Sequence, residues 1–572
     1  MSKPWPQLPV GNNDYSSPFV TIIGAGISGL CMAIDLIKRN NCRNFVILER
    51  SGGIGGTWRD NKYPGCCCDV FSILYSYSFE QNPNWSRLYP GQEELLEYII
   101  GVAEKYSLLK HIRFNSSVES ARWDEEQKKW KVHVSVDGGK DGEYSATYAL
   151  TTDFLVSAVG QLNAPQMPNI PGLDGFKGKM MHSARWDWTY DLEGKRIGVI
   201  GNGATSVQII PEIAKVASQV TVYQRTPNWV VPRLDEATPA YMKAVYKYVP
   251  GVLQRVRSAM MDFRESSHEA VTDKESEMSQ LFRSECEKSM RREFPDQPEM
   301  WKKLTPEYAP GCKRIIISDD YYPALARDNC SLETRKIERI SEKGVVVDGG
   351  EEQEFDLLVC ATGFKTVQFM YPIDIYGKNG RPFSDIWKDG ATAFQGVTVE
   401  DAPNFGIFYG PNTNLGHNSI ILMIEAQSRY LNELVGRVLK ARQSGRKLAL
   451  YPKQERVAEF NNKAQEILKR TSFNDPGCKS WYKNESGRIT NNWYGTVLEY
   501  QNMLSKVDWK DYVAEGDGVN ALPEEKESRI GRVHEETMIS NTTVVLSLLS
   551  AVAVAGGVAS GRLNLGKLLF AS

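Results

Sequence analysis

The stretch Pro18–Asn40, PFVTIIGAGISGLCMAIDLIKRN, decides the fold of this chain. A β-branched apolar run leads into Gly24-x-Gly26-x-x-Gly29, and a helical pattern follows. Gly24 permits a tight turn, Gly26 lets the backbone approach a pyrophosphate, and Gly29 lets helix and strand pack closely. The phosphates would lie at the helix N-terminus, where free N–H groups and the helix dipole favour anions. The stretch therefore predicts a Rossmann-type dinucleotide-binding domain.

The next predicted strand, NFVILER at residues 44–50, ends at Glu49, 20 residues after Gly29. A carboxylate at this position accepts hydrogen bonds from a ribose diol. It would also repel a 2′-phosphate, so the first nucleotide site is expected to hold FAD or NAD rather than NADP.

The same plan recurs in GKRIGVIGNGATSVQIIPEIAK, residues 194–215. Its turn carries Gly201 and Gly203, and Ser206 takes the third position, where a small residue still allows close packing. The following strand ends at Arg225 instead of an acid. A guanidinium there suits the 2′-phosphate of NADP, and Lys195 adds positive charge. The two sites therefore divide as FAD first and NADPH second.

A second pair of segments supports the duplication. Residues 152–160, TDFLVSAVG, and 355–364, FDLLVCATGF, share an Asp, four apolar positions and Ala-x-Gly. Each is typical of a buried strand that leaves its Rossmann domain. We expect an α/β fold with two Rossmann-like domains, the second inserted in the first, plus a helical insertion and a C-terminal apolar helix. The expected boundaries are 1–165 and 390–512 for the FAD domain, 166–228 and 311–389 for the NADPH domain, and 229–310 for the helical insertion.

The C-terminal end differs from the body. Residues 513–536 are polar and are expected to be a linker. No charged residue occurs from Thr537 to Gly561, and a bilayer span needs roughly 20 apolar residues. Residues 537–561 are therefore a candidate transmembrane helix that would hold an intracellular, cytoplasm-facing catalytic body at a membrane. The alternatives are a helix packed on the body or a disordered tail.

Composition excludes several classes of function. The net charge is −2, and no basic run interleaved with aromatic residues suggests nucleic-acid binding. Ten cysteines in 572 residues favour a reduced compartment. Cys66–Cys68 could suggest a disulfide reductase, but adjacent cysteines make a strained bridge. No His or Cys pair at ligand spacing accompanies them, so no metal site is predicted.

Phe176–Asp187, FKGKMMHSARWD, has the form F-x-G-x-x-x-H-x-x-x-W-[P/D]. It resembles the fingerprint of Baeyer–Villiger monooxygenases, which are flavoproteins with two dinucleotide-binding domains. Residues 55–79 resemble the family's flavin-side segment, and residues 311–329 resemble its catalytic-arginine segment. CATGF and GPNTNLGHNSIILMIEAQ also fit. One departure is Cys67-Cys68-Asp69 where family members often have Arg-Cys-Asp, which puts one contact to NADP in doubt.

The resemblance implies a reaction in which NADPH reduces FAD and O₂ forms a C4a-peroxyflavin. The peroxide attacks the carbonyl of a hydrophobic ketone, giving an ester or lactone. Arg314 would stabilise the negative charge on oxygen without losing its own proton, and Asp69 would hold Arg314 near the flavin. Without the resemblance, a structural salt bridge is the ordinary interpretation of Arg314.

The resemblance and the two turns together give the expected cofactor-binding residues: Gly24, Gly26, Gly29, Glu49, Gly56, Thr57, Trp58, Cys67, Cys68, Asp69, Val70, Tyr75, Gly201, Gly203, Ala204, Thr205, Ser206, Arg225, Thr226 and Lys313. His182 and Trp186 are expected to couple domain motion to cofactor position, and simple packing of His182 is an equal alternative.

Two other functions remain open at this point. A related flavin monooxygenase could oxygenate nitrogen or sulfur, and would not need Arg314 to stabilise an anion. The alternative that is not an enzyme is a membrane-tethered flavoprotein scaffold that does not oxygenate a substrate. The sequence does not identify the ketone.

Overall fold

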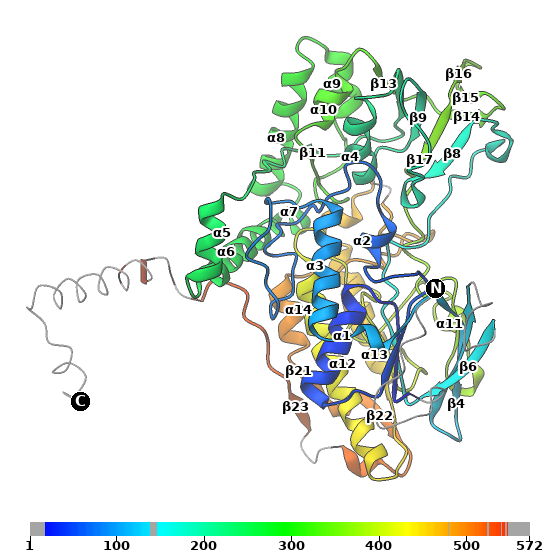
Figure 1. The fold of residues 1–572 in the computed structure, drawn as a ribbon, viewed down its shortest axis with the longest axis vertical. Coiled ribbons are helices and arrows are strands. Elements are labelled where there is room, and N and C mark those ends of the chain that lie inside the picture. Colours follow the sequence, from blue (N-terminus) through cyan, green and yellow to red (C-terminus); the bar gives the residue numbers. More distant parts are fainter. Residues whose placement is uncertain are drawn as a thin grey trace, which may run out of the picture.

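The computed structural model describes residues 18–137, 146–478, 480–522 and 526–538, with 540, 542, 543 and 546 beyond them. Its framework is two parallel five-stranded sheets, which lie toward opposite ends of the molecule (Figure 1). The first has the order β19-β7-β1-β2-β3 and the second β13-β10-β9-β17-β8. The strands of the first are β1 (Val20–Ile23), β2 (Phe45–Leu48), β3 (Ile112–Arg113), β7 (Phe154–Ser157) and β19 (Phe405–Ile407). Those of the second are β8 (Lys179–His182), β9 (Arg196–Ile200), β10 (Gln219–Tyr223), β13 (Cys330–Glu333) and β17 (Leu357–Cys360).

The strand order shows that the second unit is nested inside the first. β7 and β19 are parallel neighbours in the first sheet, yet all five strands of the second sheet lie between them in the chain. The two-domain α/β architecture expected from the paired glycine turns is therefore present.

The two glycine turns repeat the same geometry. Gly24 and Gly201 both have φ of +107°, which L side chains rarely adopt. A Cβ on Gly24 would lie 2.6 Å from the carbonyl oxygen of Ala158, and one on Gly201 would lie 2.5 Å from that of Ala361. Each turn thus packs against the strand exit that follows β7 or β17, so any larger residue would separate turn and sheet.

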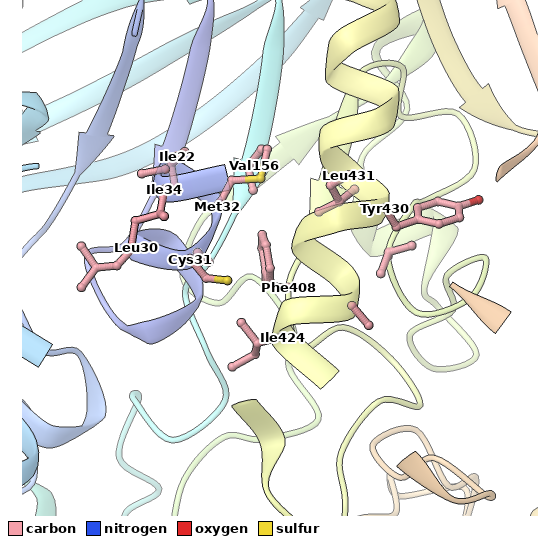
Figure 2. Packing of buried hydrophobic residues seen from close by; sticks show 14 of the residues in the cluster. Ile22, Leu30, Cys31, Met32, Ile34, Val156, Phe408, Ile424, Tyr430 and Leu431 are labelled. Atoms are coloured by element: carbon pink, nitrogen blue, oxygen red, sulfur yellow. The ribbon is translucent and has the colours of Figure 1, made fainter. Parts of the chain in front are cut away.

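The main core lies between α1 (Ile27–Asn40) and α12 (Ile420–Gln443) beneath the first sheet (Figure 2). Leu30, Cys31, Met32 and Ile34 of α1 are completely buried, because the helix presents apolar residues on most of its circumference. Polar contacts fix the register between the helices, since Ser428 donates to Asp35 at 2.6 Å. This packing holds the N-terminus of α1 in place below the first glycine turn.

Each domain carries further elements. A four-stranded sheet extends the first domain and a three-stranded antiparallel sheet the second. Their strands are β4 (Ser116–Asp124), β5 (Lys129–Val136), β6 (Thr147–Thr152) and β18 (Asp374–Tyr376), and β14 (Ile337–Ile340), β15 (Gly344–Val347) and β16 (Glu352–Glu354). The other helices of the two domains are α2 (Thr57–Asp60), α3 (Gln92–Lys105), α4 (Ala204–Ile213), α10 (Tyr321–Leu325), α11 (Phe383–Ile386), α13 (Gln454–Leu468) and α14 (Val497–Met503).

The insertion between the halves of the second domain is helical. It forms α5 (Ala240–Tyr248), α6 (Val252–Ser266), α7 (Glu269–Thr272), α8 (Glu277–Glu293) and α9 (Pro298–Leu304). It is flanked by the short parallel pair β11 (Val230–Val231) and β12 (Ile316–Ile317). The chain therefore leaves and re-enters the second domain at one point.

In the segment expected to be a linker, the described residues 513–522 and 526–536 pack on the body. Its first residues complete β22 (Tyr512–Glu515), which pairs with β20 (Ala449–Pro452), and β23 (Glu527–Arg529) pairs with β21 (Lys506–Asp508). Further along, the fully buried carboxylate of Glu535 accepts from Arg257 of α6 at 2.6 Å. The polar residues of this segment therefore do not all face solvent: some lie in paired strands, and Glu535 forms a buried ion pair.

The expected C-terminal apolar helix is not found in the described structure. No helix among the described residues is long and apolar enough to cross a bilayer. Most of the candidate range 537–561 lies outside the described residues.

A disulfide bond joins Cys312 and Cys478, which are 166 residues apart and both buried. The cysteine count had not predicted it. The bond anchors the segment that leads directly into Lys313 and Arg314.

We expect Cys478→Ser to lower the free energy of unfolding by about 2–4 kcal/mol, because the bond closes a long loop. Urea unfolding of the two proteins checks the stability. Peptide mapping without reductant should recover the linked pair, and free alkylation of both thiols in the native protein would contradict the bond.

Candidate active site

Two glycine turns meet at the N-terminus of α1. A Cβ on Gly26 would lie 3.5 Å from the Cα of Gly56, and one on Gly56 would lie 3.0 Å from the Cα of Gly26. A Cβ on Gly29 would lie only 1.9 Å from the carbonyl oxygen of Gly24. Because no side chain stands between these turns, a pyrophosphate can approach their backbone N–H groups. The geometry fits the FAD site expected from the sequence.

Glu49 lies at the end of β2, beside this turn. Its carboxylate accepts hydrogen bonds from the backbone N–H groups of Ala25 and Ser51, each at 2.8 Å. The side chain is buried and held by the turn itself. A carboxylate oxygen can accept more than one hydrogen bond, so the position still suits a ribose diol.

The segment after Gly56 builds a buried aromatic corner. Thr57 begins α2, and the indole N–H of Trp58 donates to the hydroxyl of Tyr75 at 3.2 Å. Their rings are edge to face with centroids 5.6 Å apart. Cys68 and Val70 pack into the main core, which leaves Asp69 between them directed out of it.

Asp69 and Arg314 form a two-point ion pair across 245 residues of sequence. Arg314 Nε donates to Asp69 Oδ2 and Arg314 Nη2 to Oδ1, both at 2.8 Å. Nη1 donates to the carbonyl oxygens of Leu415 and Gly416 at 3.3 and 3.1 Å. These contacts fix the plane of the guanidinium without using all its N–H donors.

The pair keeps both groups ionised. Burial by itself raises the pKa of Asp69, but Arg314 outweighs it and holds that pKa below the usual value. Burial works against the charge of Arg314 too, and Asp69 raises its pKa above the usual value. The side chains retain 20% (Arg314) and 35% (Asp69) of their accessible surface, so a ligand can reach this fixed cation.

The second turn presents an open helix N-terminus. Gly203 and Ala204 are exposed, while the hydroxyl of the buried Ser206 donates to the carbonyl of Gly201 at 2.8 Å. Thr205 is half-buried beside them. The serine therefore satisfies its own hydroxyl inside the turn and leaves the helix N–H groups for phosphate.

Three more expected NADPH residues gather at the end of β10. Arg225 is exposed there, and the carbonyl of Thr226 accepts from Asn202 at 2.9 Å. Lys313 follows the helical insertion in sequence, and its ammonium lies 4.7 Å from the centre of the Tyr308 ring. Burial, and then the charge of Arg225, lower the pKa of Lys313 to about 8. Two neighbouring cations of this kind would suit an anion such as a 2′-phosphate.

We expect kcat/KM for NADPH to fall about 10-fold as pH rises through about 8. Lys313 is charged below its pKa and attracts the phosphate, and the attraction is lost above it. NADH lacks the phosphate and should show no such fall, and Lys313→Arg should move the fall to higher pH. A pH profile for NADH that parallels the one for NADPH would contradict this assignment.

The cysteine run connects the two domains. Gln208 of α4 accepts from Tyr63 at 2.9 Å and from the N–H of Cys67 at 3.4 Å, and it donates to the carbonyl of Cys67 at 3.1 Å. Arg233 donates to the sulfur of Cys67 at 3.0 Å. Burial raises the pKa of the Cys66 and Cys67 thiols to about 12 and 11. Cys67 is therefore a contact between the two domains, and neither thiol has the lowered pKa of a redox-active cysteine.

The fingerprint segment contains an edge strand of the second sheet. Lys179–His182 forms β8, which pairs with β17. His182 accepts from the N–H of Ala184 at 3.1 Å and caps a short 3-10 turn, and Trp186 is buried in the core of the second domain. Asp187 pairs with Lys179 at 2.6 Å. These contacts agree with the packing interpretation of His182.

The helical insertion contacts the loop that holds Arg314. The N-terminus of α12 meets α6, where Glu265 accepts from Asn418 at 2.6 Å. The ring of His417 is tilted by 59° against that of His268 with centroids 4.8 Å apart, and its Nε2 lies 3.6 Å from Glu265. Charged residues on an amphipathic helix look like a solvated face, so no sequence signal separated these from the others.

The flavin-binding monooxygenase-like family matches residues 18–375. The chain is 51% identical to the FAD-binding monooxygenase ktnD of Aspergillus niger, over 96% of this chain and 90% of that protein. It is 40% identical to a Baeyer–Villiger monooxygenase of Streptomyces coelicolor, over 86% of this chain and 92% of that one. A solved complex of OTEMO with FAD and NADP superposes with a TM-score of 0.75 and 26% identity, covering 87% of this chain and all of the other.

These similarities agree with the paired glycine turns and with the pair that Arg314 forms with Asp69. The cofactors are FAD and NADPH, and the chain belongs to the Baeyer–Villiger monooxygenase family of flavin-dependent oxidoreductases.

Proposed function

We propose that this enzyme inserts one oxygen atom of O₂ into a hydrophobic ketone to give an ester or lactone. The observation that carries the proposal is the two-point pair of Arg314 with Asp69, at 2.8 Å on both sides. An arginine that is fixed, charged and accessible suits a reaction in which negative charge develops on oxygen.

Bound FAD, reduced by NADPH, supplies the electrons and the oxygen chemistry. The protein's own residues orient the Arg314 guanidinium and stabilise the negative charge that develops on oxygen. Asp69 sets the plane of the Arg314 guanidinium, and Leu415 and Gly416 fix its third nitrogen. The remaining donor capacity of Arg314 is free to bond an oxygen anion at the reacting centre. Since Arg314 remains protonated throughout, it acts by charge and not by proton transfer.

The cofactor residues divide between the two turns in this proposal. Gly24, Gly26, Gly29 and Gly56 would hold the FAD pyrophosphate, and Glu49 would hold the ribose. Gly203, Ala204 and Thr205 would meet the NADPH pyrophosphate, while Arg225 and Lys313 would bind its 2′-phosphate. The nearness of Lys313 to Arg225, far apart in the sequence, supports the second assignment.

The test uses the purified holoenzyme, reduced with NADPH without oxygen and then mixed with ¹⁸O₂ and a panel of ketones, amines and sulfides. Esters that contain one ¹⁸O atom would support the proposal. Oxidation of amines or sulfides alone would assign the enzyme to nitrogen or sulfur oxygenation. Hydrogen peroxide as the only product would indicate a flavoprotein that does not transfer oxygen.

A further inference from the structure

Arg314 is held from two sides, and only one of them is Asp69. The carboxylate bonds Nε and Nη2, whereas Nη1 donates to the carbonyl oxygens of Leu415 and Gly416 at 3.3 and 3.1 Å. These carbonyls belong to the loop 415–419, which leads directly into α12. The position of this loop therefore decides where the third nitrogen of the guanidinium is bonded.

One side chain of the helical insertion reaches this loop from α6. The Oε2 of Glu265 accepts from the amide of Asn418, and its Oε1 accepts from the backbone N–H of Val497, both at 2.6 Å. The Nε2 of His417 lies 3.6 Å from the same Oε2. Glu265 thus joins α6 to the loop 415–419 and to the first residue of α14.

Glu265 is ionised in this position. Burial by itself raises the pKa of Glu265, but the contacts with its three partners outweigh it and hold that pKa below the usual value. The Glu265 side chain retains only 13% of its accessible surface, and His417 and Asn418 are buried. Hydrogen bonds to a charged group in such surroundings are strong and directional. The carboxylate can therefore fix the loop in one position.

The amide of Asn418 is oriented at both ends. Its Nδ2 donates to Glu265 and, more weakly, to the sulfur of Met261 at 3.2 Å, while its Oδ1 accepts from the N–H of Ser419 at 2.7 Å. A flipped amide would set donor against donor at Ser419 and acceptor against acceptor at Glu265. One orientation satisfies all these groups, and the carbonyls that bond Arg314 precede this amide by two and three residues.

We propose that Glu265 is a positioning residue for Arg314. It acts through Asn418 and the two carbonyls that bond Nη1, so that the helical insertion as well as Asp69 sets the plane of the guanidinium. The inference rests on the proposed ketone oxygenation and adds the residue that connects the insertion to it. A small displacement of a catalytic group lowers the rate strongly, because the productive geometry is narrow.

The test exchanges the two partners. Glu265→Gln sets an amide against the amide of Asn418, and Asn418→Asp sets a carboxylate against that of Glu265, so each single variant loses a hydrogen bond. In the exchanged variant, Glu265→Gln with Asn418→Asp, the new amide donates to the new carboxylate, and the acceptors for Val497 and Ser419 remain. Only the weak contact with Met261 is lost.

The measurement is single-turnover ester formation by holoenzyme reduced with NADPH and then mixed with O₂ and acetophenone, cyclohexanone or 2-dodecanone. We expect each single variant to lower the saturating rate about 10-fold and to release more hydrogen peroxide, with half-saturation by the ketone changed less than about twofold. The exchanged variant should return to within about threefold of the unmodified enzyme. Anaerobic flavin reduction should stay the same, because the described contacts of Glu265 reach neither glycine turn.

A second background separates positioning of Arg314 from general stability. Arg314→Lys has a single ammonium, which cannot take the places of Nε, Nη1 and Nη2 at once. Adding Glu265→Gln to Arg314→Lys should therefore lower ester formation less than about twofold. Glu269→Gln, on an exposed acid of the same insertion, is the matched control and should keep the full rate. FAD content and melting temperature verify that each variant is folded.

Three results would overturn this inference alone, provided that the unmodified enzyme makes ester. The first is single variants as fast as the unmodified enzyme, and the second is an exchanged variant as slow as the single ones. The third is a full Glu265→Gln loss in the Arg314→Lys background. Absence of ester from every ketone with the unmodified enzyme would refute the proposed function and this inference with it.

Discussion

Arg314→Ala should reduce ester formation by at least about 100-fold, because removing one preorganised donor from a developing oxyanion typically costs 10²–10³ in rate. FAD content should stay the same, since the pyrophosphate turns around Gly24 and Gly56 are distant in the chain and do not use this side chain. Anaerobic reduction of the flavin by NADPH should continue. Stopped-flow reduction and product analysis measure the two steps separately.

Two control variants test whether the loss is specific to the position and geometry of Arg314. Arg314→Lys keeps a positive charge but loses the two-point geometry on Asp69, so it should recover only part of the activity. Arg292→Ala removes an exposed arginine and should leave ester formation intact. An Arg314→Ala enzyme that still makes ester at the original rate would rule out the role assigned to this residue.

Glu535→Gln should lower the free energy of unfolding by about 3–5 kcal/mol, because it leaves the fully buried Arg257 without its carboxylate. Urea unfolding followed by tryptophan fluorescence measures the loss. Glu527→Gln is the matched control in the same segment. Its partner Lys506 is exposed, so the expected cost is below about 1 kcal/mol.

The loss in Glu535→Gln should also depend on pH. Burial raises the pKa of Glu425 to about 7, and Arg257 is close enough to oppose that shift. Above this pKa Glu425 is ionised and compensates part of the Arg257 charge, whereas below it Glu425 is neutral. The variant should therefore lose more stability at pH 6 than at pH 8. Equal losses at both pH values would show that Glu425 does not share this cation.

Much of the fold could be predicted because its signals are local. The spacing of Gly24, Gly26 and Gly29, and of Gly201, Gly203 and Ser206, is set by one turn and the helix after it. The two Ala-x-Gly strand exits then meet those turns through Ala158 and Ala361. Each of these features depends on residues that are close in sequence or on a pattern that recurs, so it can be recognised in the sequence.

The site was predictable only where a motif stood for a long-range contact. Asp69 and Arg314 lie 245 residues apart, and nothing in composition or periodicity pairs them; the resemblance to a family did. For Gln208 and Cys67, or Arg257 and Glu535, no motif was available. Charged and polar residues look the same in sequence whether they are solvated or buried with a partner.

The sequence by itself determined two nested α/β units with paired glycine turns, because backbone turns and strand ends are local. The division of FAD and NADPH between them stays a prediction. Only the tertiary structure decided that the polar residues 513–522 and 526–536 pack on the body and that Glu535 pairs with Arg257 in its interior. Burial and pairing are relations between distant residues, and their energies arise only when the folded chain removes both from water.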